Sequence, residues 1–270
     1  MPNLKPDGNS KWDQFFIELQ TQGRYSFTFE ELGNRFKLSE KALLQGLYRY
    51  KTKKQIAQIR KGFYVIVTPN YQNQGMLPLY LFINDLMKSL GKPYYIGLLS
   101  AAALYGAAHQ QPMEYFVMAE TPAPRSIKNQ KLKVSFVSKN SWEQDDIVKK
   151  TTDSGYINVS SPELTALDLL AYADKIGLNR VVSVLQELAQ AMKPAALTKT
   201  AMRYQNTTVI QRLGYLLDDV IGEKKLSDSL MKALNSRTVS QVMLVTRKKK
   251  VGEINTTWRV INNVIIESDL

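Results

Sequence analysis

Basic side chains crowd one short stretch of this sequence, and binding a polyanion is the chemistry that they suit best. The residues from Arg35 to Lys61 include nine Lys or Arg and a single acid, Glu40, so this tenth of the chain has a net charge of +8. The whole chain of 270 residues has a net charge of +12. Because Lys and Arg attract phosphates regardless of base sequence, the stretch predicts a nucleic-acid interface. The alternative is a solvated basic face that packs against a partner protein.

The apolar spacing within this stretch predicts a helix that holds the basic residues in place. Ser39 is a suitable N-cap for it. Apolar residues then recur three and four positions apart, which places them on one side of a helix; they are Leu43, Leu44, Leu47 and Tyr50. The opposite side is expected to be exposed and rich in hydrogen-bond donors. It consists of Lys41, Gln45, Tyr48 and Thr52, with Arg49 flanking.

The neighbouring segments predict a winged helix-turn-helix around this helix. A first helix is expected over residues 10–22, and Thr28 with Glu31 forms a capping box for a second. Residues 56–59 and 63–67 are β-rich and meet at a basic turn, which predicts a hairpin. In this architecture the third helix enters the major groove and the wing contacts the DNA backbone or the minor groove. We expect base contacts from Lys41, Gln45, Tyr48 and Arg49, and phosphate contacts from Lys51, Lys53, Lys54, Arg60 and Lys61.

The rest of the chain predicts a second domain, so the expected fold class is α+β. An N-terminal winged helix-turn-helix would be followed by a mixed α/β C-terminal domain with a small sheet and a helical subdomain. The predicted boundaries are a flexible lead-in at 1–9, the DNA-binding domain at 10–68, a linker at 69–78 and the C-terminal domain at 79–270. Short strands are expected at residues 94–96, 115–119, 132–137 and 156–159.

Three further local predictions concern the C-terminal domain. One helix is expected to begin with a capping box of Ser160 and Glu163. Another is expected to begin with Ser227 as its cap. The tail is expected to return to strands at 239–246 and 255–266, joined by a basic turn.

Two scarce residue types limit the catalytic classes that are open to this protein. The chain has no cysteine, which excludes disulfides and thiolate metal sites. His109 is the single histidine, and it follows an Ala-rich segment like a helix-end residue rather than a base. We therefore expect no enzyme, no metal and no cofactor. An enzyme on a nucleotidyltransferase-like fold would need several carboxylates in one cleft.

The most apolar run, residues 96–108, is too short to span a bilayer, so a cytoplasmic protein without a membrane partner is expected.

Five segments in chain order carry a family resemblance: IRKGFYVI, YYIGLLSAAALYG, VSSPELTALDLL, VIQRLGYLLD and TTWRVINN. Together they resemble the AbiEi antitoxins of bacterial abortive-infection and type IV toxin–antitoxin systems. The resemblance implies an autorepressor that binds double-stranded DNA at inverted repeats upstream of its own operon. It also implies a C-terminal domain that counteracts a nucleotidyltransferase-like toxin, usually without a stable complex.

The resemblance suggests a candidate antitoxin surface, and it leaves a second function class open. The surface would consist of basic C-terminal residues, for which a solvated loop and solvated helix faces are the alternative: Arg203, Arg212, Arg247, Lys248, Lys249 and Lys250. The second class is a stand-alone winged-helix transcription regulator whose C-terminal domain senses a ligand or a protein. A deep apolar pocket with a few polar groups in that domain would favour it.

Overall fold

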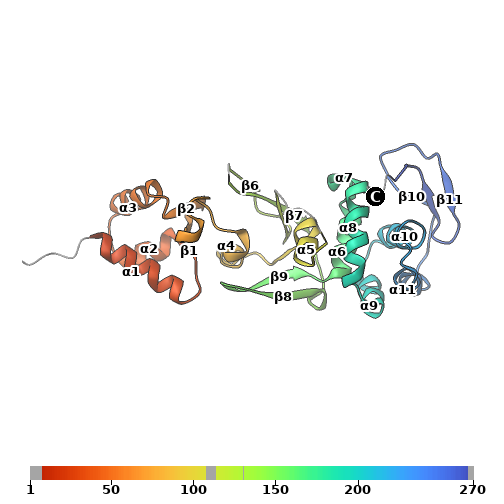
Figure 1. The fold of residues 1–270 in the computed structure, drawn as a ribbon, viewed down its shortest axis with the longest axis horizontal. Helices are drawn as coiled ribbons and strands as arrows, with labels where there is room; N and C mark the ends of the chain where they lie inside the picture. Colours follow the sequence, from red (N-terminus) through yellow and green to blue (C-terminus); the bar gives the residue numbers. More distant parts are fainter. Residues whose placement is uncertain (1–7, 108–113, 130, 267–270) are drawn as a thin grey trace, which may run out of the picture. The chain divides into compact units, whose positions relative to one another are not determined.

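Three helices and a three-stranded sheet make up the N-terminal part of the protein. The computed structural model describes residues 8–107, 114–129 and 131–266. Its first elements are α1 (Gly8–Thr21), β1 (Ser26–Thr28), α2 (Phe29–Phe36), α3 (Glu40–Thr52), β2 (Ile56–Arg60) and β3 (Phe63–Ile66) (Figure 1). The strands are antiparallel and lie in the order β1-β3-β2. This order of elements is the one predicted for a winged helix-turn-helix, with β1 as an added short strand.

Side-chain caps fix where α2 and α3 begin. The Thr28 hydroxyl accepts from the Glu31 N–H at 3.1 Å, and the Glu31 carboxylate accepts from the Thr28 N–H at 2.8 Å, which confirms the predicted capping box. Burial favours a higher pKa for Glu31, but its hydrogen bonds from Thr28 and Arg24 hold the pKa below the ordinary value. Ser39 caps α3, because its hydroxyl accepts from the Ala42 N–H at 3.3 Å.

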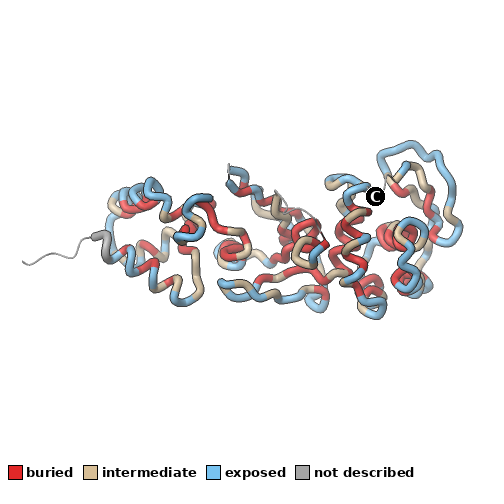
Figure 2. Tube along the Cα trace, viewed as in Figure 1, coloured by how far each residue is buried: buried red, intermediate tan, exposed pale blue. Residues whose placement is uncertain are grey.

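An aromatic core holds α3 against the two preceding helices. Trp12 of α1 lies between the rings of Phe36 and Tyr50, with centroid distances of 5.2 and 5.4 Å and nearly parallel planes. A Cβ atom on Gly46 of α3 would lie 2.5 Å from Cζ2 of Trp12, so glycine is required where the two helices meet. Figure 2 shows the buried faces of α1, α2 and α3 turned toward one another. The opposite face of α3 is therefore exposed.

A six-stranded mixed sheet follows in the chain. Its order is β6 (Ile127–Lys128), β7 (Lys133–Lys139), β5 (Tyr115–Glu120), β4 (Tyr94–Ile96), β9 (Gly155–Ser160) and β8 (Ile147–Thr152). β4 and β9 are parallel, with Ile96 opposite Val159. The predicted strands correspond to β4, β5, β7 and β9, whereas β6 and β8 were not predicted. The helices α4 (Ile83–Ser89) and α5 (Leu98–Leu104) flank β4 in sequence.

Helices dominate the chain after β9, with α6 (Pro162–Ala171) at their centre. Every residue from Glu163 to Leu170 is buried, and α6 contacts α5, α8, α9 and α10. The helices that follow it are α7 (Ala173–Ile176), α8 (Leu178–Leu188), α9 (Pro194–Arg203), α10 (Thr207–Tyr215) and α11 (Lys224–Leu234), and a π-helical turn (Leu216–Val220) precedes α11. A second small sheet has the order β10 (Val242–Met243), β12 (Val260–Asn262) and β11 (Glu253–Asn255).

Contacts between residues divide the chain into two units. The first comprises Met1–Tyr94, Ala119–Ser138 and Lys149–Asn158, and the second comprises Tyr95–Met118, Lys139–Val148 and Val159–Leu270. Residues 69–78 contain a 3-10 turn at Pro69–Tyr71 and the buried side chains of Met76 and Leu77. The division of the chain at this segment stays a prediction.

Two predictions about helix starts are wrong, because α6 and α11 begin at other residues than predicted. Ser161, not Ser160, caps α6, since its hydroxyl accepts from the Leu164 N–H at 3.1 Å. Ser160 is the last residue of β9, and the Glu163 carboxylate accepts from the Lys193 N–H at 2.9 Å instead of closing a capping box. Ser227 lies inside α11, which begins at Lys224.

Two predictions about apolar patterns are also wrong. Leu44 is 49% exposed, because it lies about 100° around the helix from Leu43 and outside the buried stripe. The tail forms only the two- and three-residue strands β10, β11 and β12 rather than two long strands. The basic turn between them extends over residues that lack apolar alternation, so strand pairing stops early.

Candidate nucleic-acid interface

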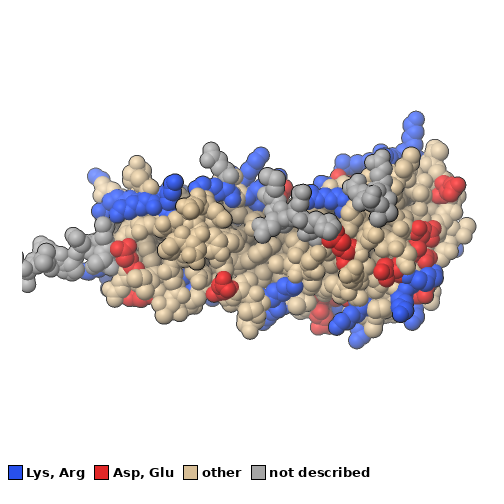
Figure 3. All heavy atoms as spheres, in the orientation of Figure 1, with Lys and Arg blue, Asp and Glu red and all other residues tan. Residues whose placement is uncertain are grey.

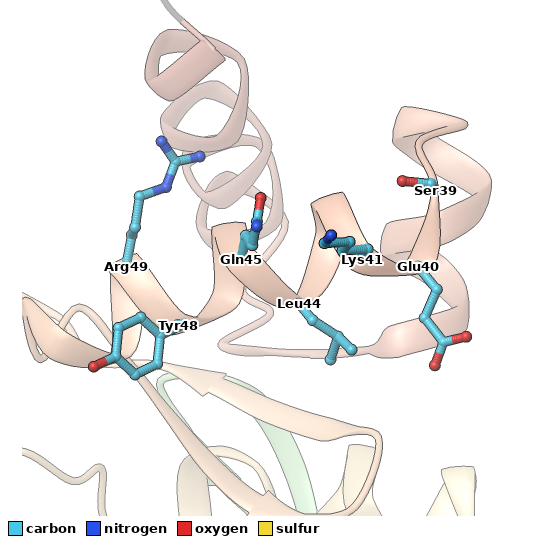
Figure 4. Close-up of a pocket in the computed structure, with 7 residues that line it drawn as sticks. All are labelled: Ser39, Glu40, Lys41, Leu44, Gln45, Tyr48 and Arg49. Carbon is cyan, nitrogen blue, oxygen red and sulfur yellow. The ribbon is translucent and has the colours of Figure 1, made fainter.

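The exposed face of α3 presents two parallel rows of side chains. Figure 4 shows Lys41, Gln45 and Arg49 on one side of the helix, and Glu40, Leu44 and Tyr48 on the other. The spacing of four residues within each row aligns the side chains along the helix axis. These six residues and Ser39 line an open pocket, and Tyr48 is 70% exposed. The structure thus brings together Lys41, Gln45, Tyr48 and Arg49, the four residues predicted to contact bases.

The C-terminal end of α3 carries three more of the predicted contact residues. Lys51, Lys53 and Lys54 are all exposed. The Lys51 ammonium donates to Oε1 of Gln58 in β2 at 3.2 Å. Lys54 adopts a left-handed backbone with φ of 56°, a conformation that L residues other than glycine rarely adopt. The helix therefore ends sharply, and the lysines stand at the junction between α3 and the wing.

The two basic residues of the β2–β3 hairpin differ in their surroundings. Lys61 is exposed at the turn, where Gly62 supplies the left-handed backbone with φ of 78°. Arg60 is partly buried beside a register shift between Gln58 and Arg60. Its Nη1 atom is buried and has no hydrogen-bond acceptor among the residues that the structure describes. Lys61 is thus available to a partner as it stands, whereas Arg60 would have to rotate outward.

Two acids of α1 near α3 are engaged away from its exposed face, so that Glu40 is the one acid among the residues that line this face. Asp13 accepts from the Tyr50 hydroxyl at 2.9 Å, and burial together with this carboxylate raises the pKa of Tyr50. Glu18 pairs with Arg35 at 2.7 Å. Figure 3 shows Lys and Arg side chains gathered over the part of the molecule where Figure 1 places α3. The exposed face of α3 is consequently electropositive.

The C-terminal basic residues lie in three different places. Arg203 lines a small cavity beside α9 and pairs with Asp146 at 2.5 Å and with Asp145 at 3.7 Å, so its charge is largely compensated. Three of the others, Arg212, Arg247 and Lys248, line a second cavity of about 730 Å³. Lys249 and Lys250 are exposed in the loop that follows β10.

A buried ionic network centred on Asp168 of α6 was not predicted. The side chain of Asp168 has no exposed surface and accepts from the Lys139 ammonium at 2.7 Å, the Tyr95 hydroxyl at 2.7 Å and the Tyr204 hydroxyl at 3.0 Å. The Lys139 ammonium also lies 5.5 and 5.2 Å from the ring centroids of these two tyrosines. Burial and the Asp168 charge raise the pKa of both tyrosines, which stay neutral donors. The one signal in the sequence is an acid, Asp168, among the leucines and alanines of a mostly apolar helix.

Comparisons with known proteins identify the part of the chain that holds this network. The family model of the AbiEi antitoxin C-terminal domain matches residues 95–219. Residues 95–219 are thus similar to the AbiEi antitoxin C-terminal domain. The crystal structure of the RV2827C protein from Mycobacterium tuberculosis is similar over 93% of this chain and 91% of that one, with a TM-score of 0.66 and 15% sequence identity. At that identity the likeness concerns the fold alone. A search of the curated proteins found no match.

The AbiEi match confirms the family resemblance of the sequence and supports an antitoxin or regulator role in a type IV toxin–antitoxin system. The AbiEi antitoxins are not an enzyme family. Within the described ranges, no helix is long and apolar enough to cross a bilayer, and no three acidic or histidine side chains gather as metal ligands would. His109 lies outside the described residues.

Proposed function

We propose that this protein binds double-stranded DNA through α3 and the β2–β3 wing, and represses its own operon from inverted repeats. The observation that carries the proposal is the exposed face of α3, which presents Lys41, Gln45, Tyr48 and Arg49 beside one acid, Glu40. Two acids of α1, Asp13 and Glu18, are engaged elsewhere, with Tyr50 and Arg35. An α-helix fits the major groove, where each base pair presents a distinct pattern of donors and acceptors. The basic end of α3 and the wing supply the phosphate contacts that set its register.

The two rows on α3 suit different base-pair edges. Arg and Lys donate to the O6 and N7 acceptors of guanine, and Gln pairs with the N6 and N7 edge of adenine. Lys41, Gln45 and Arg49 are therefore proposed to contact purines. Leu44 and Tyr48 form an apolar row that suits the thymine methyl group, and Glu40 beside them can accept from the cytosine amino group. Lys51, Lys53, Lys54, Arg60 and Lys61 are proposed to contact phosphates.

The AbiEi antitoxin C-terminal domain is proposed to counteract a nucleotidyltransferase-like toxin from the same operon, without forming a stable complex with it. Support comes from the family match over residues 95–219. Because the proposed DNA contacts lie in α3 and the wing, and the matched residues begin after them, repression and toxin neutralisation are expected to be separable by substitution.

A pair of cellular assays with one double variant tests both halves of this proposal. Lys41→Ala with Arg49→Ala is expected to release a reporter placed behind the protein's own upstream region, and to leave protection against the co-expressed neighbouring toxin gene intact. Lys88→Ala is the matched control, because Lys88 is an exposed lysine on α4, outside the proposed interface. Continued repression by the double variant would refute the DNA-binding role, and failure of the wild type to protect would refute the antitoxin role.

A stand-alone regulator with a ligand-sensing C-terminal domain is the second candidate function. The observation that favours it is the cavity that Arg212, Arg247 and Lys248 line. A wild-type protein that represses the reporter but gives no protection against the neighbouring gene would favour this candidate.

A further inference from the structure

One cavity in the C-terminal part combines clustered cations with an apolar wall. Its volume is about 730 Å³, within the range of roughly 300 to 1,000 Å³ that is common for ligand sites. Leu170 and Leu244 give it a buried apolar surface. The lining includes four cationic residues, Arg180, Arg212, Arg247 and Lys248, and one acidic residue, Asp174.

Arg212 is the cation whose position is best fixed. Its Nε donates to the backbone oxygen of Met243 at 2.8 Å, and the guanidinium is partly buried. Among the described residues, no carboxylate forms an ion pair with it. Burial lowers the pKa of Arg212, but an arginine stays protonated at neutral pH. A desolvated cation without an ion pair is unfavourable, and a bound anion would offset that cost.

The remaining charges of the cavity form no ion pair with Arg212. The Asp174 carboxylate favours the charged form of Arg212 electrostatically, but it lies 3.3 Å from Nε of Arg247 and forms its ion pair there. Arg180 at the start of α8 and Lys248 after β10 are exposed, and neither has an acidic partner in the described part of the chain. An excess of positive charge therefore remains on the rim and around Arg212.

From this arrangement we infer that the cavity binds a small amphipathic anion, a carboxylate or phosphate monoester carried on an apolar body. The fixed Nε of Arg212 leaves both Nη groups as donors for the anion, a geometry that suits carboxylate and phosphate oxygens. The apolar body would pack against Leu170 and Leu244. Val264 and Ile265 extend that apolar wall from the tail, beyond the residues that match the AbiEi antitoxin model. The inference is independent of DNA binding and of toxin neutralisation.

Ligand titrations of the full chain test this inference without any DNA. The probes are 4-phenylbutyrate and phenyl phosphate, with 4-phenylbutanol as the neutral counterpart and inorganic phosphate as an anion without an apolar body. At least one amphipathic anion is expected to raise the Tm and to bind more tightly than either comparison compound. If neither amphipathic anion raises the Tm, or if both comparison compounds bind as tightly, the inference is overturned.

Matched variants locate the binding. Arg212→Gln is expected to lower the affinity for the amphipathic anion roughly tenfold or more, the factor expected for the loss of a charge-assisted hydrogen bond. Arg212 also donates to the backbone oxygen of Met243, so its replacement could change the local structure. Arg180→Gln is therefore a second variant, because Arg180 is exposed, and it is expected to lower the affinity for the anion less than Arg212→Gln does. Lys225→Gln removes the same charge from an exposed position outside the cavity lining and should leave the affinity unchanged. Equal affinities in wild type, Arg180→Gln and Arg212→Gln would place the ligand elsewhere and refute the site.

Discussion

Replacing Asp168 by Asn should destabilise the region that matches the AbiEi antitoxin C-terminal domain, because Asp168 contacts Lys139, Tyr95 and Tyr204 there. Asn keeps the shape but removes the charge that compensates Lys139, whose side chain is only 15% exposed. Breaking a buried ion pair from one side costs about 3 to 5 kcal/mol. Because Lys139 keeps some contact with solvent, we expect the lower end of that range, about 3 kcal/mol. Tyr95→Phe removes one hydrogen bond to a charged acceptor and should cost about 1.5 to 3 kcal/mol.

Native-state hydrogen exchange measures this loss where it occurs, in peptides from β4 and α6. A local readout is needed because a chain with two units need not unfold in a single two-state step. Peptides from α3 are the internal reference, and we expect no change in their protection. Asp145→Asn is the matched control, because its carboxylate is 84% exposed and the substitution should change stability by less than about 0.5 kcal/mol. A loss below about 1 kcal/mol for Asp168→Asn would contradict the argument that this network stabilises α6.

Three other predictions concern DNA binding and acid stability. Lys53→Ala and Lys61→Ala should each reduce the slope of log affinity against log salt by about one unit, and an unchanged slope would exclude phosphate contacts there. Deoxyuridine in place of a contacted thymine removes one methyl group and should weaken DNA binding by the wild type about fourfold. The DNA affinity of Leu44→Ala should not change with this replacement. Equal losses of affinity in both proteins would exclude the apolar contact. Burial favours a higher pKa for Asp218, but hydrogen bonds from Trp258 and Lys224 keep the pKa below its ordinary value. The stability that ionised Asp218 contributes is therefore present above about pH 4 and is lost as the pH falls through the folded-state pKa. Asp218→Asn should make the fall of Tm in acid less steep. A Tm that falls as steeply in the variant as in the wild type would refute this.

The N-terminal fold could be predicted because its determinants are local in sequence. The capping box of Thr28 and Glu31, the N-cap Ser39 and the turn at Gly62 each act within a few residues, and all three are present. The exposed face of α3 follows from the same periodicity. Leu44 shows where periodicity fails. It is assigned to the core because it is apolar, but its position around the helix axis, at the edge of the apolar stripe, leaves it exposed.

The C-terminal sites could not be predicted because they depend on contacts between distant residues. Lys139 and Tyr95 reach Asp168 from other elements, 29 and 73 positions away along the chain. The cavity around Arg212 likewise needs Leu244 and Val264 from the tail, whose strands are only two and three residues long. The periodicity of a sequence does not indicate which distant residues contact each other. Arg203 illustrates the consequence, since a basic side chain expected on a surface is paired with Asp146.

DNA recognition by α3 is tested by a titration of the purified protein against its own upstream DNA and a scrambled fragment, at two salt concentrations. We expect the wild type to prefer the native fragment by roughly a thousandfold and to keep this preference at the higher salt. The Lys41→Ala and Arg49→Ala double variant should lose the preference while keeping weak, salt-sensitive binding to both fragments. Equal binding of the wild type to the two fragments, or an undiminished preference in the double variant, would contradict the assignment of α3 as the element that recognises the operator.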